Sequence, residues 1–162
     1  MSINGWLQEF RALHKRARQK QLNEEEKLLY LQAREQFARA LTAAQGMTLK
    51  PGEMARQTFR VAQAMQLELS LNTGIVRAMT LDVSKGGFSV MLGKPPGEAE
   101  VVGFTLRMPD GMDPIIGRAK VVASKKQIGN YRLSFSFHGM SEYDQERLES
   151  VLFDAALSRI PG

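Results

Sequence analysis

The spacing of apolar residues changes partway along this chain, and this change most constrains its fold. Up to about residue 46, apolar residues recur every three or four positions, which predicts amphipathic helices. From Met65 to Leu71 they alternate strictly with Gln, Glu and Ser, which predicts a strand with one solvent-facing side. The chain must therefore combine a helical segment with a sheet.

The second part of the sequence alternates short apolar segments with turn residues. We expect six strands, at about 65–71, 75–81, 88–92, 101–108, 115–123 and 131–137. Asn72-Thr73-Gly74 and Pro109-Asp110-Gly111 are typical turn sequences. Ser141 is an N-cap for a last helix, with Asp144 three residues later. Consecutive short strands of this kind predict an antiparallel sheet or barrel.

Two helices precede the strands. The first is expected over 3–20, and the second runs from the Asn23 N-cap to about 45, with Glu26 in the capping-box position. Leu29 and Phe37 belong to the apolar stripe that we predict for the second helix. The predicted organisation is a helical hairpin at 1–46, a linker at 47–60 and a β-domain with a C-terminal helix at 61–162.

Composition excludes several kinds of function. The 162 residues include no Cys and two His, so disulfides, Cys-ligated metals and His-based catalytic or zinc sites are not expected. We identify no carboxylate pair, activated nucleophile or phosphate loop, and we expect no enzyme activity, cofactor or metal. No apolar run approaches the roughly 20 residues that span a bilayer, and residues 1–10 lack a secretion signal. We therefore expect a cytoplasmic protein that does not insert into membranes.

Two short motifs carry the chemistry. Arg56 and Arg60 form an RxxxR motif between the linker and the first strand, and Asp82, Ser84 and Gly87 form a DxSxxG motif one hairpin later. With so many arginines in the chain RxxxR alone is weak evidence, whereas DxSxxG is more specific. Their joint occurrence in this order is a strong signal.

On these motifs, residues 55 to about 159 resemble the PilZ domain family of bacteria. The resemblance implies an α+β fold that is mainly β: a six-stranded antiparallel barrel with a C-terminal helix, here preceded by the αα-hairpin. It also implies a non-catalytic receptor for the second messenger cyclic di-GMP. In this resemblance Arg56 and Arg60 engage guanine and phosphate, while Asp82, Ser84 and Gly87 line the opposing surface.

The chemistry of these side chains agrees with such a ligand. An Arg guanidinium can form a fork with phosphate oxygens or with guanine O6 and N7. Asp82 offers acceptors to the N1–H and N2–H₂ edge of guanine, and the Ser84 hydroxyl can donate or accept. Gly87 permits a positive φ or a close approach of the backbone to a ligand. Without a ligand, the same residues would be read as solvated charges and turn residues.

The N-terminal helices suggest an output surface. We expect ligand binding to order the linker and re-orient these helices toward a protein partner, and their amphipathic character also allows self-association. One alternative is an interaction module of the same fold that binds no ligand. The other is nucleic-acid binding by the first helix, where Arg11, Lys15, Arg16, Arg18 and Lys20 occur without an acidic residue among them.

Overall fold

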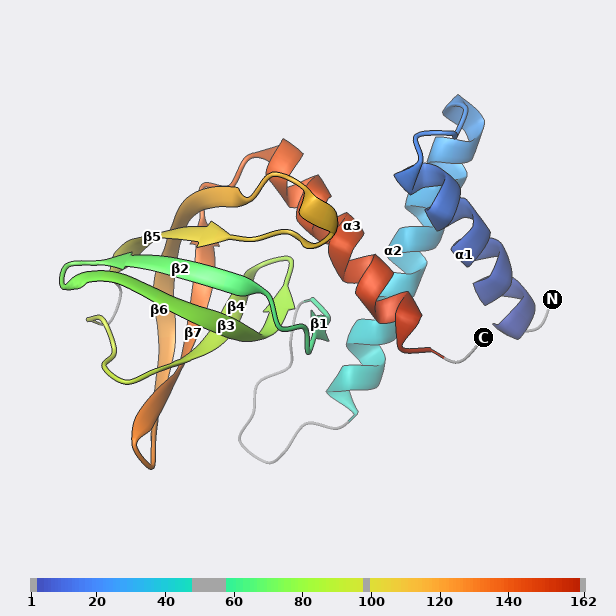
Figure 1. Ribbon diagram of the computed structural model, residues 1–162. Coiled ribbons are helices and arrows are strands. Elements are labelled where there is room, and N and C mark those ends of the chain that lie inside the picture. The colour runs from blue at the N-terminus through green and yellow to red at the C-terminus, as the bar shows by residue number, and fades with distance from the viewer. Residues whose placement is uncertain (1–2, 48–57, 98–99, 161–162) are drawn as a thin grey trace. The chain divides into compact units, whose positions relative to one another are not determined.

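The structure is a computed structural model that describes residues 3–47, 58–97 and 100–160. Its elements in chain order are α1 (Ile3–Arg18), α2 (Glu24–Gly46), β1 (Arg60–Val61), β2 (Gln66–Leu71), β3 (Gly74–Ser84), β4 (Gly87–Leu92), β5 (Val101–Leu106), the 3₁₀ turn η1 (Pro109–Gly111), β6 (Ile115–Gln127), β7 (Asn130–His138) and α3 (Glu142–Ser158) (Figure 1). The chain divides into two compact units, described separately below. The helical unit comprises Met1–Phe59 with Phe153–Gly162, and the barrel unit comprises Arg60–Leu152.

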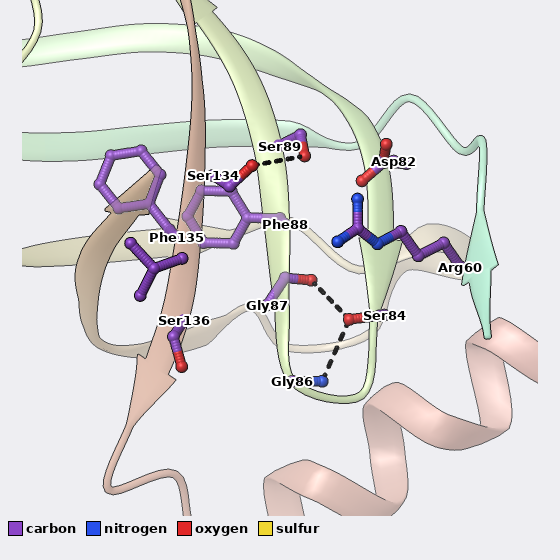
Figure 2. A pocket seen from close by; sticks show the side chains of 11 residues that line it. Arg60, Asp82, Ser84, Gly86, Gly87, Phe88, Ser89, Ser134, Phe135 and Ser136 are labelled. Atoms are coloured by element: carbon purple, nitrogen blue, oxygen red, sulfur yellow. Dashed lines mark hydrogen bonds between the residues drawn. The ribbon is translucent and has the colours of Figure 1, made fainter. Parts of the chain in front are cut away.

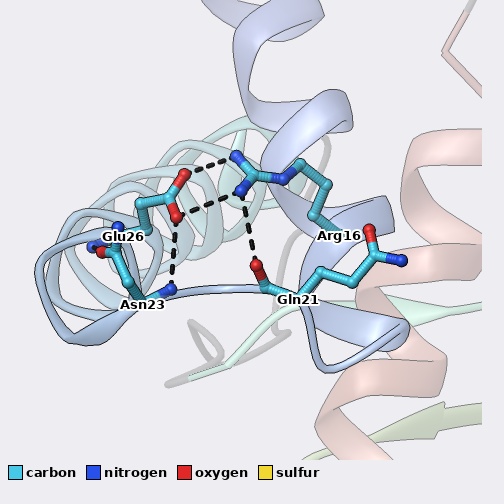
Figure 3. A network of polar contacts seen from close by, with 4 residues as sticks. All are labelled: Arg16, Gln21, Asn23 and Glu26. Carbon is cyan, nitrogen blue, oxygen red and sulfur yellow. Dashed lines mark hydrogen bonds and ion pairs between the residues drawn. The ribbon is translucent and has the colours of Figure 1, made fainter.

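A polar network fixes the turn between α1 and α2. The Asn23 side chain accepts a hydrogen bond from the Glu26 amide at 2.8 Å, and the Asn23 amide donates to Glu26 Oε1 at 3.2 Å. Arg16 pairs with the same carboxylate and donates to the Gln21 carbonyl at 3.3 Å (Figure 3). The capping box predicted from the sequence is therefore present, and Arg16 ties it to the preceding helix.

The buried face of α2 overlaps only in part with the predicted stripe. Leu29 is 58% exposed, whereas Tyr30, Arg34 and Phe37 are buried. Arg34 fits there because its guanidinium lies 5.5 Å from the Tyr30 ring centroid and 5.4 Å from that of Phe153. Phe37 is thus buried as predicted, whereas aromatic packing brings Tyr30 and Arg34 to the buried face in place of Leu29.

The barrel unit is a closed antiparallel sheet. The strand order β3-β2-β5-β6-β7-β4 closes through additional pairing of β3 with β4, which confirms the predicted six-stranded barrel. β1 adds two residues to the edge of β3 and was not predicted. Inward-facing residues on every strand of the barrel are almost fully buried, among them Leu67, Val83, Val90, Leu106, Ile115 and Leu133. Burial of this apolar surface stabilises the barrel.

Two bulges lengthen strands beyond their predicted bounds. β3 shifts register against β4 between Thr80 and Asp82, and β6 shifts against β7 between Val121 and Ala123. An extra residue in a strand inverts the phase of the apolar alternation. The alternation in the sequence therefore ends at the bulge, although the strand continues beyond it. As a result Asp82 and Ser84 lie within β3, and only Lys85 and Gly86 form the turn that was predicted to hold the whole motif.

No helix in the described part of the chain is long and apolar enough to cross a membrane.

Candidate functional site

The sheet brings one arginine of the first motif to the second motif. Arg60 in β1 is the register partner of Ser84, and Ser84 is in turn the register partner of Gly87 across the β3–β4 turn. Asp82 lies two residues from Ser84 along β3, opposite Ser89. Arg60, Asp82, Ser84 and Gly87 all line one pocket of about 150 Å³ (Figure 2). Arg56, the fifth predicted residue, lies outside the described residues.

Small residues form much of the rest of this pocket. Gly86, Ser89, Ser134 and Ser136 line it together with Phe88, Val122 and Phe135. The Ser89 and Ser134 hydroxyls are 3.4 Å apart on adjacent strands. Ser89 is 2% exposed, whereas the half-buried Ser134 and Ser136 on β7 can offer donors and acceptors to a planar polar group. These serines were not predicted as site residues, because their proximity depends on the pairing of β4 with β7.

Gly87 is needed by the sheet itself. A Cβ at this position would lie 1.8 Å from the Phe135 carbonyl oxygen of β7. Its φ is not positive, unlike that of Gly74, so the conformational reason proposed for a glycine here is wrong and the close approach of two backbones replaces it. Gly87 therefore shapes the pocket by allowing β4 and β7 to pair closely.

Ser84 and Lys85 fix the turn beside the pocket. The Gly86 amide donates to the Ser84 hydroxyl at 3.2 Å, and that hydroxyl lies 3.5 Å from the Gly87 carbonyl oxygen. Lys85 pairs with Glu149 of α3 at 3.1 Å. The Ser84 hydroxyl thus has a structural role in the turn, which positions it at the pocket wall.

Asp82 has a partner that was not predicted from the sequence. Arg132 in β7 donates from Nη2 to Asp82 Oδ2 at 3.0 Å. The Asp82 side chain is 16% exposed and that of Arg132 is 42% exposed. Residues 132, 134 and 136 alternate along β7 and so share one face, but only the strand pairing shows that this face carries the pocket.

Opposite charges and hydroxyls suit this pocket to a ligand that has both phosphate and base edges. The Arg60 guanidinium extends toward the strand that carries Asp82 and Ser84 (Figure 2). A guanidinium can pair with phosphate, and a carboxylate can accept from a purine edge. No group of three or more potential metal ligands occurs among residues of the described ranges.

The basic residues of α1 are partly engaged within the helical unit. Arg11 donates to the Ile160 carbonyl, and Arg16 pairs with Glu26. Of the five cations on which the nucleic-acid alternative depends, Arg16 is thus paired with a carboxylate and Arg11 is engaged by a backbone carbonyl.

The PilZ domain family matches residues 55–154 of the sequence. The chain belongs to the PilZ domain family. The matched PilZ region includes both motifs and all the strands of the barrel. No curated protein matches the chain in sequence.

Several solved structures share the PilZ fold of this chain. The inhibitor of motility MotI/DgrA of Bacillus subtilis aligns with a TM-score of 0.59 and 18% identity, over 67% of this chain and 54% of its own. YcgR of Escherichia coli in complex with c-di-GMP aligns with a TM-score of 0.56 and 20% identity, over 64% and 46%. MrkH of K. pneumonia in complex with c-di-GMP aligns with a TM-score of 0.55 and 19% identity, over 65% and 53%. This PilZ chain thus matches about half the length of these proteins, and at such identities the likeness shows the fold alone.

Proposed function

We propose that this chain is a non-catalytic receptor for cyclic di-GMP. The observation that carries the proposal is the grouping of Arg60, Asp82, Ser84 and Gly87 around one pocket of a PilZ barrel. Two of the solved structures that share this fold are complexes of other PilZ proteins with c-di-GMP.

Each pocket residue has a distinct role in this proposal. Arg60 pairs with a phosphate or with the O6 and N7 atoms of guanine, and Asp82 accepts from the N1–H and N2–H₂ edge. Ser84 adds a hydroxyl, and Gly87 shapes the pocket by allowing β4 and β7 to pair closely. The pocket volume of about 150 Å³ is below the roughly 300–1,000 Å³ of sites that enclose a drug-sized ligand. The described pocket accordingly takes one part of the dinucleotide, and Arg56 contributes to the rest.

Isothermal titration calorimetry with cyclic di-GMP tests this proposal. The unchanged chain is expected to bind, and Arg60→Ala is expected to weaken binding at least about tenfold, because hydrogen bonds to charged groups are worth about 1.5–3 kcal/mol. Arg77→Ala is the matched control, since Arg77 is 84% exposed on β3 and does not line the pocket. Absence of binding by the unchanged chain would instead support an interaction module of the same fold.

Signalling would follow from a change in the helical unit. In this proposal the ligand orders the linker at 47–60 and alters how the helices face a protein partner. Small-angle X-ray scattering of the full chain with and without saturating cyclic di-GMP should then give different profiles. Identical profiles at saturation would contradict this part of the proposal while leaving ligand binding intact.

A further inference from the structure

The ion pair between Arg132 and Asp82 joins two strands that are not neighbours in the barrel. Asp82 lies on β3 and Arg132 on β7, with β4 between them. On the outward face, Ser89 and Ser134 are paired in the row that contains Asp82, and Arg132 lies two residues further along β7, opposite Met91. Two residues correspond to about 6.6 Å along a strand. The Arg132 side chain therefore extends across β4, toward the row of Ser89 and Ser134, to contact the Asp82 carboxylate.

This contact constrains a carboxylate that is largely buried. At 16% exposure the Asp82 carboxylate has lost much of its hydration, which costs free energy unless a cation is close. The Arg132 guanidinium at 3.0 Å is such a cation, and it also restricts the Asp82 side chain to one orientation. The contact engages one oxygen, Oδ2, whereas a carboxylate can accept about four hydrogen bonds through its two oxygens. The pair thus leaves acceptor capacity for a ligand.

We infer that Arg132 is a positioning residue that sets base specificity, by holding the Asp82 carboxylate in the orientation in which it accepts from the N1–H and N2–H₂ edge of guanine. This inference rests on the proposed function. It differs from a role in general affinity for anions, because Arg132 acts through Asp82. A purine without those donors, such as adenine, gains little from a well-positioned carboxylate.

The test compares binding of cyclic di-GMP and cyclic di-AMP by calorimetry in the full chain. Arg132→Met is expected to weaken cyclic di-GMP binding about five- to tenfold, in line with loss of about 1 kcal/mol or slightly more, and to change cyclic di-AMP binding much less. Lys125→Met is the matched control, because Lys125 is the register partner of Arg132 on β6 and carries the same charge. This control should leave the ratio of the two affinities unchanged.

A double-mutant cycle tests whether Arg132 acts through Asp82. If it does, Asp82→Asn together with Arg132→Met should bind cyclic di-GMP no more weakly than Asp82→Asn alone. Additive losses would overturn the inference, as would an unchanged affinity ratio in Arg132→Met. Tighter binding by Arg132→Met would overturn it too, because it would show that Arg132 competes with the ligand.

Two further measurements keep the outcomes separate. If Arg132→Met does not fold, as judged by thermal unfolding, Arg132→Gln replaces it, because Gln stays polar but lacks the charge; an unchanged affinity ratio in Arg132→Gln would likewise overturn the inference. Failure of the unchanged chain to bind cyclic di-GMP would overturn the proposed function and this inference together. Normal binding by the unchanged chain with no loss of selectivity in the variants would overturn this inference alone.

Discussion

At the scale of single residues, the neighbouring Gly86 and Gly87 differ in whether the fold has room for a side chain. A Cβ on Gly87 would lie 1.8 Å from the Phe135 carbonyl oxygen, whereas a Cβ on Gly86 has Ser84 Oγ as its nearest neighbour at 3.9 Å. The DxSxxG motif requires only the second of them. Its requirement arises from the packing of β4 against β7, which lie far apart in the sequence.

Substitution by alanine should separate the two glycines. Gly87→Ala is expected to destabilise the barrel by about 3 kcal/mol, because two backbones must move apart to admit the methyl group. Gly86→Ala should stay close to the unchanged chain in thermal or denaturant unfolding. Equal stability of the two variants would contradict the close approach seen at Gly87.

At the scale of elements, local features were predictable and features that depend on strand pairing were not. The Asn23–Glu26 capping box was visible because its partners are three residues apart. The DxSxxG residues were identified as a site, but their placement in β3 depended on a bulge at Leu81 that inverts the alternation. Arg132 could not be connected with Asp82, because the pair is separated by 50 positions and is created by sheet closure.

The capping box of α2 gives a prediction at the same scale. Asn23→Ala removes the acceptor for the Glu26 amide, and loss of an N-cap typically costs about 1 kcal/mol. We expect the helical unit to unfold at a lower denaturant concentration, monitored by the fluorescence of Trp6, the one tryptophan of the chain. Asn23→Ser is the control, since Ser also caps helices well. An unchanged midpoint in Asn23→Ala would show that the remaining contacts of Arg16 and Glu26 fix the turn without the Asn23 side chain (Figure 3).

At the scale of the whole molecule, the contacts of the helical unit connect the two ends of the chain. His14 of α1 is 4% exposed, with Nδ1 2.8 Å from the Tyr30 hydroxyl and Nε2 3.4 Å from Asp154 Oδ1. Burial lowers the pKa of His14 below its ordinary value of 6.5, as do the nearby charges of Arg18 and Arg34, and the Asp154 carboxylate offsets part of this effect. His14 thus contacts both the second N-terminal helix and the C-terminal residues, and its lowered pKa favours the neutral form.

This histidine makes the stability of the helical unit depend on pH. Because the pKa is lower in the folded state, the unfolded chain binds a proton first as the pH falls through 6.5, and the free energy of unfolding decreases from there down to the folded-state pKa. The slope can approach about 1.4 kcal/mol per pH unit for one group. Denaturant unfolding followed by Trp6 fluorescence between about pH 7.5 and 5.5 measures it. His14→Gln should flatten the slope over this range whatever its effect on stability at pH 7.5, whereas the exposed His138→Gln should leave it intact. An equal slope in His14→Gln and in the unchanged chain would show that His14 does not link the folding of these helices to protons.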